Sequence, residues 1–206
     1  MGGPHEITTV EELEAIYGAP RPQSLIKEVG TLTREYRTWI EAAPFAVLAS
    51  VGDGGLDCTP RGDAGRIVEV LDDRTLLLAD RPGNNRIDTL RNLVQDPRVA
   101  LLFLIPGREE TMRVNGRAVI SRDPCLLARC NMAGKLPRTV LVITVESVYF
   151  QCARAVKRSR LWESPADGQT PPLPSIGDML QSISEGGVDS ATYDAELQER
   201  LNTTLY

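Results

Sequence analysis

Histidine is nearly absent from this chain of 206 residues, in which His5 is the single example. His5 lies in a Gly/Pro-rich N-terminal stretch, a type of segment that seldom belongs to a packed core. A Ser-His-Asp triad, a Cys-His dyad and a His-rich metal site each need a histidine that the fold holds in place. The sequence therefore argues against these three kinds of catalytic or metal site.

Long apolar runs are also missing, since the longest extends only from Val99 to Ile105. A helix that crosses a bilayer needs roughly 20 apolar residues. The N-terminal stretch is acidic and lacks the apolar segment of a signal peptide. We therefore expect a soluble, cytoplasmic protein with no membrane partner.

The cysteines lack the Cys-x-x-Cys spacing of zinc knuckles and of thioredoxin-type motifs. In a cytosolic protein this pattern favours buried free thiols that act as small apolar side chains. We expect this role for all four of them, namely Cys58, Cys125, Cys130 and Cys152.

Lysine is scarce, with 3 Lys against 20 Arg, and the net charge is −5. An acidic chain argues against general binding to nucleic acids or membranes. Arginine is the better fork for phosphate and carboxylate groups, so the bias suits an anion site. A genome of high GC content raises Arg in the same way, and only the placement of the arginines separates the two explanations.

Apolar residues make up 42% of the chain and charged residues 25%, which suits one domain with appendages. We predict three parts. Residues 1–44 form an N-terminal helical segment that packs on a barrel, residues 45–163 form the barrel domain, and residues 164–206 form a Pro-rich linker and C-terminal helices.

Two helices are predicted in the N-terminal part. Thr9 and Glu12 have the spacing of a capping box, in which the Thr hydroxyl accepts from an end amide and the Glu reaches back. Apolar residues on one face predict a second helix over 24–43, which Pro44 ends.

Short strands separated by turn residues dominate the middle of the chain. Their short links favour an antiparallel barrel over a doubly wound parallel sheet, so the predicted class is mainly β with flanking helices (α+β). The predicted strands are 45–50, 56–61, 67–71, 75–80, 99–105, 111–121 and 138–149, and the later predicted helices are 85–96, 123–132, 176–184 and 191–201.

Arg61, Gly62 and Asp63 follow directly after a predicted strand. One interpretation is a charged turn with a local ion pair. The other is an Arg fork held at a strand end and aimed at an anion.

The segment from Asp80 to Arg86 leads from a strand into a helix, with Asn85 as its expected cap. A helix N-terminus offers free amides and a partial positive charge, so a phosphate can bind there. Arg86 is expected in the first turn, where a cation opposes the helix dipole and is better explained by a nearby anion. The alternative is an ordinary tight turn with an Asn cap.

Two later segments carry further candidates. Alternation along a strand places Arg113, Asn115 and Arg117 on one face, which either lines a site or is simply solvated. In the basic segment 154–162, Trp162 or an Arg could stack on a flat ring while Ser159 forms a hydrogen bond.

The four candidate segments just described follow one another along the chain as in a known family. The chain resembles the pyridoxamine 5'-phosphate oxidase-related flavin-binding proteins, and within them a subfamily of FMN-dependent enzymes. The resemblance covers roughly residues 20–163. The runs that carry it are Thr59-Pro-Arg-Gly-Asp63, Leu77-Leu-Ala-Asp-Arg-Pro-Gly-Asn-Asn-Arg86, Leu102-Phe-Leu-Ile-Pro-Gly107 with Arg113-Val-Asn-Gly-Arg117, and Arg158-Ser-Arg-Leu-Trp162.

The resemblance implies an antiparallel split β-barrel that binds FMN as a homodimer, with both subunits contributing to each of two sites at their interface. Arg61 matches the strand arginine near the flavin phosphate. Asn85 and Arg86 match the phosphate-binding position at the helix start. Gly62 and Asp63 are implied to lie along the ring or the ribityl chain.

The implied cofactor site includes further residues from each of the later runs. Arg113, Asn115 and Arg117 match a strand that approaches the flavin, and the late segment matches one that closes the site. The remaining members of the implied site are Asp80, Asn84, Ser159, Arg160 and Trp162.

The chain also departs from the family pattern. Close relatives often carry His-Cys and then Lys before the late run, where this chain has Gln151, Cys152 and Arg154. A chain whose single histidine is His5 also lacks the late Arg-x-His motif with which true pyridoxamine 5'-phosphate oxidases hold their substrate.

The resulting hypothesis is an FMN-binding oxidoreductase that transfers hydride to or from a small substrate. A charged fork such as Arg160 could orient an acidic substrate. The alternative is a non-catalytic module that binds or stores flavin or senses redox state. A third interpretation keeps the fold but replaces FMN with a deazaflavin or a haem, for which His5 is a poor ligand.

Overall fold

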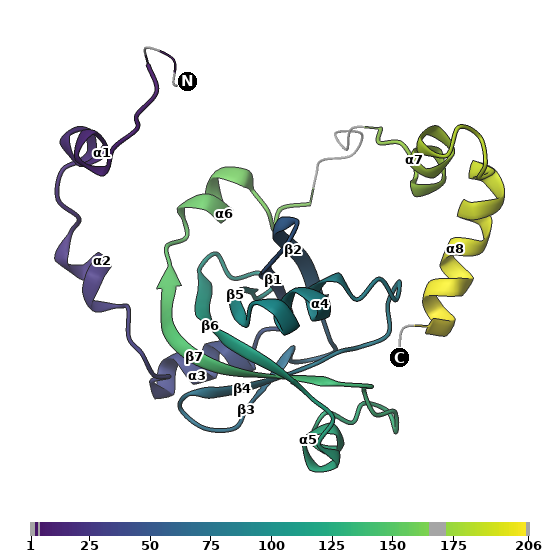
Figure 1. The fold of residues 1–206 in the computed structure, drawn as a ribbon, viewed down its shortest axis with the longest axis horizontal. Coiled ribbons are helices and arrows are strands. Elements are labelled where there is room, and N and C mark those ends of the chain that lie inside the picture. Colours follow the sequence, from purple (N-terminus) through teal and green to yellow (C-terminus); the bar gives the residue numbers. More distant parts are fainter. Residues whose placement is uncertain (1–2, 4, 165–171, 205–206) are drawn as a thin grey trace.

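A computed structural model of the chain describes residues 3, 5–164 and 172–204. Its centre is a strongly curved seven-stranded sheet in the order β2-β1-β5-β6-β7-β4-β3, in which every neighbouring pair is antiparallel (Figure 1). The strands are β1 (Phe45–Gly52), β2 (Gly55–Gly62), β3 (Val68–Val70), β4 (Thr75–Ala79), β5 (Arg98–Leu104), β6 (Thr111–Ser121) and β7 (Val140–Gln151). This sheet with its flanking helices confirms the predicted α+β split barrel.

Strand alternation decides which side chains enter the barrel. In β6 the side chains of Met112, Val114 and Ala118 are at most 2% exposed, while their neighbours Arg113 and Asn115 lie partly open on the other face. Period-two burial of this kind is the expected property of a sheet with one covered face.

The core lies inside the curve of the sheet. Phe103 and Leu101 of β5 meet Leu48 of β1 and Ile143 of β7 there, and all four are at most 1% exposed. Ile40, from the helix next to β3, closes the same cluster and is fully buried. The contacts join segments that lie far apart in the sequence, so the barrel forms a single core.

The helices flank this barrel. Thr9 and Glu12 form the predicted capping box. The bounds are α1 (Val10–Tyr17), α2 (Pro22–Ile26), α3 (Arg34–Glu41), α4 (Asp88–Gln95), α5 (Pro124–Arg129), α6 (Arg154–Ser159), α7 (Ile176–Ile183) and α8 (Ser190–Thr204).

The single helix predicted over 24–43 is wrong, because α2 and α3 are separate. Between them Val29 forms a bridge with Val148 of β7, with N···O distances of 3.2 and 2.9 Å, so the backbone is used by the sheet rather than by a helix. Thr33 then starts α3 by accepting from the amide of Tyr36. Apolar periodicity alone does not reveal this competition.

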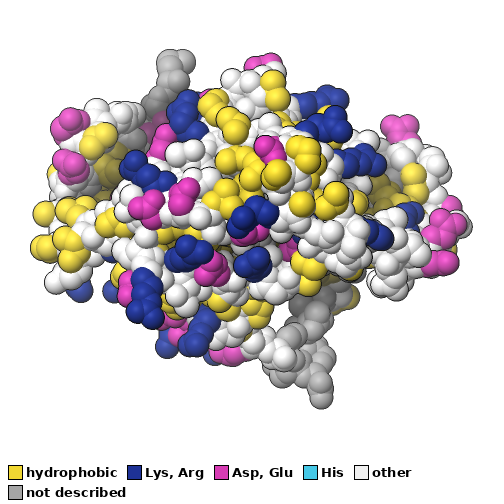
Figure 2. All heavy atoms as spheres, turned by 90° about the horizontal axis from the view of Figure 1, so that it is seen from below, with side chains coloured by type: hydrophobic (Ala, Val, Ile, Leu, Met, Phe, Trp, Pro, Cys, Tyr) yellow, Lys and Arg dark blue, Asp and Glu magenta, His cyan; other side chains and the backbone are white. Residues whose placement is uncertain are grey.

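The termini differ from the barrel in their packing. No residue of α1 is buried, and α7 and α8 pack against each other. In Figure 2, carboxylates stand out at the two ends of the view, on the segments before and after the barrel. The predicted Pro-rich linker falls largely on residues 165–171, outside the described residues. None of the described helices is both long enough and apolar enough to span a membrane.

Gly116 offers a direct test of the sheet. It lies at a β-bulge between β6 and β7, and a Cβ atom there would come within 2.1 Å of the Thr144 carbonyl oxygen. Because a backbone atom cannot move aside easily, we expect Gly116→Ala to lower the free energy of unfolding by about 1–3 kcal/mol.

Urea denaturation measures this loss. The matched control is Gly54→Ala, because a Cβ atom at Gly54 would meet no other atom within 4 Å. The control should change stability by less than about 0.5 kcal/mol. Equal stabilities for both variants would contradict the packing described here.

Candidate functional site: a cation-rich cavity at the barrel seam

Two crossed ion pairs hold together strands that are not neighbours in the sheet. Arg61, in β2 on one edge, donates from Nη1 to Asp80 Oδ1, next to β4, at 3.1 Å. Arg81 donates from Nε to Asp63 Oδ2 at 2.7 Å, so the second pair runs in the opposite sense. The pairs therefore join the β2 edge to the end of β4 and close the seam of the split barrel.

These pairs are shielded from solvent to different degrees. The side chains of Arg61 and Asp80 are each 20% exposed, whereas Arg81 is 14% and Asp63 only 4% exposed. Arg81 also donates from Nη1 to the Cys130 carbonyl at 2.9 Å, which ties α5 to the seam. Buried charges are retained at a fixed position only when they are paired in this way.

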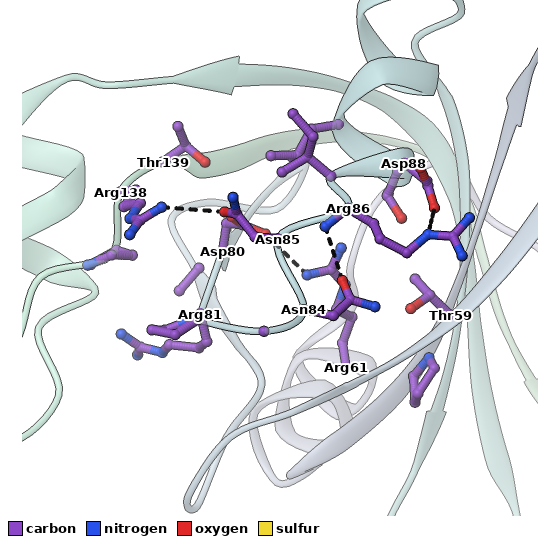
Figure 3. Close-up of a pocket in the computed structure, with 18 of the residues that line it drawn as sticks. Thr59, Arg61, Asp80, Arg81, Asn84, Asn85, Arg86, Asp88, Arg138 and Thr139 are labelled. Carbon is purple, nitrogen blue, oxygen red and sulfur yellow. Dashed lines mark hydrogen bonds and ion pairs between the residues drawn. The ribbon is translucent and has the colours of Figure 1, made fainter. Parts of the chain in front are cut away.

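A cavity of about 1190 Å³ opens above the seam (Figure 3). Its walls are the ends of β2 and β4, the loop 82–87, the start of α4 and the loop 135–139. Typical pockets for cofactors and small molecules have volumes of about 300–1,000 Å³. The cavity is therefore large enough for a ligand of cofactor size.

Positive charge predominates in the lining of this cavity. The lining contains five Arg or Lys side chains against three carboxylates. Such an excess favours an anionic ligand, since Arg in particular binds phosphate and carboxylate through paired hydrogen bonds. The cations are Arg61, Arg81, Arg86, Lys135 and Arg138, and the carboxylates are Asp57, Asp80 and Asp88.

Two polar atoms of the lining have no hydrogen-bond partner although they are buried. They are Arg61 Nε, on the guanidinium that Asp80 holds, and Thr139 Oγ1 at the start of β7. Buried polar atoms in native proteins are nearly always paired. A hydrogen-bonding ligand that enters this cavity could satisfy both of them.

The loop before α4 is built from unusual backbone conformations. Asn85 and Ile87 have φ of 60° and 54°, in the left-handed region. A β-branched residue such as Ile87 is strained there, and this kind of strain often occurs at ligand-binding sites.

The predicted helix start is wrong by two residues. α4 begins at Asp88, its N-cap is Ile87, and no side chain caps it. Asn85 is therefore not the cap, and Arg86 precedes the first turn instead of lying in it. Asn85 Oδ1 accepts from Arg138 Nη1 at 3.3 Å instead, because the left-handed loop turns it toward the 135–139 wall.

The start of α4, where no side chain caps the first amides, lines the cavity. Helix N-terminal amides and their partial positive charge favour an anion. Arg86 lies beside them and pairs through Nε with Asp88 Oδ2 at 2.7 Å. That pair is exposed, at 73% and 46%, so it is weak and its cation can exchange to a ligand.

The position of α4 is fixed from behind by side chains that sequence analysis missed. Asn92 donates from Nδ2 to Ser50 Oγ at 3.0 Å, and Ser50 is only 2% exposed. Asn92 fits because Gly52 lacks a side chain: a Cβ there would lie 2.0 Å from Asn92 Oδ1. The β1–β2 hairpin therefore sets the place of the α4 N-terminus.

The structure brings together part of the predicted site. Asp63 is not in the cavity lining but belongs to the seam, where it pairs with Arg81. The predicted residues that line the cavity are Arg61, Gly62, Asp80, Asn84, Asn85 and Arg86.

Arg113 and Asn115 lie elsewhere, in a shallow hollow of about 210 Å³ on the outer face of β1, β5 and β6. Arg113 Nη1 donates to the Tyr149 hydroxyl at 3.0 Å, and Asn115 Nδ2 donates to Ser147 Oγ at 3.2 Å. Arg117 lies farther along the same strand and is exposed. Within one chain, these three residues are not part of the seam cavity.

The late segment is also outside the cavity. It forms α6, a helix that the sequence did not predict, and Ser159 Oγ donates to the Val156 carbonyl within it. Trp162 Nε1 donates to the Arg108 carbonyl at 2.6 Å, which fixes the segment to the β5–β6 turn. Arg160 has φ of 51° and ends α6.

The 135–139 wall was not predicted to be part of the site. It supplies two cations and the unpartnered Thr139 hydroxyl. One signal was available in the sequence, since Lys135, Pro137 and Arg138 form a basic loop just before a long strand. Sequence reasoning about separate segments does not show that this loop faces Asn85.

The prediction of four buried thiols is wrong for three of them. Cys58, Cys125 and Cys152 are exposed, because Cys58 lies in an edge strand and the other two at element ends. Cys130 alone is buried, and burial raises the pKa of its thiol. This thiol therefore stays protonated to a higher pH than an exposed one.

The curved antiparallel sheet, the helices around it and the seam define a split β-barrel protein of the α+β class. Residues 32–152 match the sequence profile of the family described as pyridoxamine 5'-phosphate oxidase. The chain therefore belongs to this family, whose members commonly bind a flavin and commonly form dimers.

Several solved structures are similar to the chain at low identity. HupZ of Group A Streptococcus is 22% identical, with a TM-score of 0.46 over 57% of this chain and 91% of that chain. General stress protein 26 of Bacillus anthracis is 18% identical, with a TM-score of 0.43 over 55% and 88%. A protein described as F420 reductase is 19% identical, with a TM-score of 0.42 over 58% and 98%. No curated protein matches the chain.

The buried ion pair at the seam is open to mutational test. Asp63→Ala removes the carboxylate beside Arg81, whose side chain is only 14% exposed. Breaking a buried pair from one side costs about 3–5 kcal/mol, so we expect a loss of this size in the free energy of unfolding.

The control is Glu41→Ala, which removes the exposed pair with Arg37 on α3. It should cost about 0.3–0.5 kcal/mol, and guanidinium denaturation of both variants measures the two losses. If Asp63→Ala were no more harmful than this control, the seam pair would not be what closes the barrel.

Proposed function

We propose that the seam cavity binds FMN and that the protein is a flavin-dependent oxidoreductase acting on a small substrate. The observation that carries this proposal is the excess of cations in the cavity together with the buried, unpartnered Nε of Arg61. Both features favour a ligand that carries negative charge. Membership of a family that commonly binds flavin makes a flavin phosphate the first candidate.

The phosphate is proposed to lie at the start of α4. The helix amides and the Arg86 guanidinium lie at this point, and Arg138 lines the facing wall of the same cavity. Arg86 is available because its pair with Asp88 is exposed and readily exchanged. Charge-assisted hydrogen bonds to a phosphate are about twice as strong as neutral ones.

Arg61 has a different proposed role, which is to orient the ligand beyond its phosphate. Asp80 fixes the guanidinium through Nη1, while Nε is buried without a partner in this cavity-lining side chain. A side chain whose direction is already set loses little entropy when it binds.

When bound, FMN supplies the hydride-transfer chemistry, and the protein supplies binding, orientation and shielding from water. This division removes the need for a catalytic histidine, which His5 alone could not meet. We assign no residue of the chain as catalytic.

We further propose a homodimer in which two copies complete each site. The candidate residues fall into two groups: one lines the seam cavity, and the other lies on the outer sheet face and α6. The hollow around Arg113 is lined mainly by apolar side chains from β1 and β5, as a subunit contact would be. A second copy could bring the outer-sheet residues of the second group to the cavity of the first.

The first experiment is a visible absorption spectrum of the purified protein, followed by heat release and identification of the chromophore. The proposal expects a yellow protein that releases FMN. It also expects NAD(P)H to bleach the flavin and air to restore it. A colourless protein that does not bind added FMN, or one that releases a deazaflavin, would contradict the cofactor assignment. A flavin that no nicotinamide reduces would favour a storage or sensing module.

Arg86→Ala tests the phosphate position. Loss of one charge-assisted contact should weaken FMN binding by about 1.5–3 kcal/mol, or roughly 10–150-fold in Kd. Fluorescence titration with FMN measures the change, and sedimentation velocity shows whether the dimer persists. The control is Arg122→Ala, an exposed arginine outside the cavity lining. Equal FMN affinity in both variants would place the phosphate elsewhere.

A further inference from the structure

The net charge of this chain comes from its C-terminal end. Residues 175–206 carry six Asp and Glu side chains and one Arg, for a net charge of −5. The whole chain also has a net charge of −5, so residues 1–174 are neutral in sum. The segment that contains α7 and α8 is therefore acidic, whereas the rest of the chain is neutral in sum.

α7 also presents an apolar stripe that the described part of its own chain leaves largely exposed. Ile176, Met179, Leu180 and Ile183 recur at helical spacing and share one face. Of these, Ile176, Met179 and Ile183 are 47%, 45% and 77% exposed. A contiguous exposed stripe of this kind marks a contact surface more often than a solvated one.

The two helices form a preorganised unit. The amide of Gly177 donates to Asp194 Oδ1 at 2.9 Å, and Ser190 Oγ donates to Asp178 Oδ1 at 2.7 Å. A Cβ at Gly177 would lie 2.5 Å from the Ser190 carbonyl oxygen, so the helices touch closely. Among the residues that the structure describes, no hydrogen bond or ion pair joins this unit to the barrel.

The complementary surface is on α6 of the same sequence. Arg154 and Arg158 are exposed and form no ion pair within the described part of the chain, and Arg160 lies next to them. Leu161 and Trp162 follow, at 49% and 38% exposed. This surface is basic and apolar, where the helix pair is acidic and apolar. Figure 1 shows α6 at the top of the barrel and the helix pair standing to one side of it.

We propose that α7 and α8 dock on the α6 surface of a second copy of the chain. The apolar stripe of α7 would cover Leu161 and Trp162, while Glu196 and Glu199 of α8 would face Arg154 and Arg158. A twofold arrangement forms the contact twice and satisfies both surfaces of both copies. The occupant is a second copy because the helix pair leaves its own α6 uncovered.

Charge reversal in pairs tests this contact in the full-length protein. The first variant combines Arg154→Glu with Arg158→Glu, and the second combines Glu196→Arg with Glu199→Arg. Glu196 and Glu199 are suitable because the contacts inside the helix pair use Asp178 and Asp194. A third protein carries all four substitutions in one chain.

The readout is acrylamide quenching of tryptophan fluorescence, which reports on the exposed ring of Trp162. Trp39 packs against the core and supplies a constant background. Each double variant alone should quench about twofold more readily than the parent, since like charges then face each other. High salt should move the parent toward the same value.

Mixing decides where the helix pair docks. An equal mixture of the two double variants, refolded together, should regain the quenching of the parent, because each chain then meets its complement in the other. The four-substitution chain should regain it as well. Recovery in the four-substitution chain but not in the mixture would overturn the second copy as occupant, and unchanged quenching in every variant would overturn docking on α6.

Discussion

Two ion pairs close the split barrel at a place where no ladder of backbone hydrogen bonds joins its strands. β2 and β4 are not neighbours in the sheet, and the pairs Arg61–Asp80 and Asp63–Arg81 join their ends. Because each segment contributes one cation and one anion, the seam is neutral and has a fixed register. The cavity lies on this seam, so the charges that close the barrel also shape the site. Asp80 in particular holds Arg61 in place, and Nε of this cavity-lining side chain stays buried without a partner.

Much of the fold was predictable from the sequence, for local reasons. The turn from Gly52 to Gly55, the strand 111–121 and the capping box at Thr9 each follow from residue types that permit few alternatives. The errors have a common physical cause, which is competition from distant partners. Pairing of Val29 with β7 interrupted a predicted helix, and the left-handed loop before Asp88 delayed α4.

The candidate site was predictable only segment by segment. Arg61 and the loop 80–86 were found because strand ends and helix starts are common anion sites. The 135–139 wall was missed, because no local signal shows that it faces Asn85. The support behind α4 was missed too, since Asn92 reads as an ordinary polar helix residue until Gly52 is seen beneath it. Arg113 and Trp162 show the opposite error, since both were predicted as site residues and neither lies in the cavity of a single chain.

The separation of charge between barrel and C-terminal helices also affects colloidal behaviour. Proteins remain dispersed partly because molecules of like net charge repel each other. Residues 1–174 are neutral in sum at pH 7, so this repulsion comes from the final segment alone. A chain cut after residue 174 would be near its isoelectric point in ordinary neutral buffers, with its cation-rich cavity and the apolar hollow on its sheet face still exposed. The final segment therefore supplies the net negative charge through which copies of the chain repel each other.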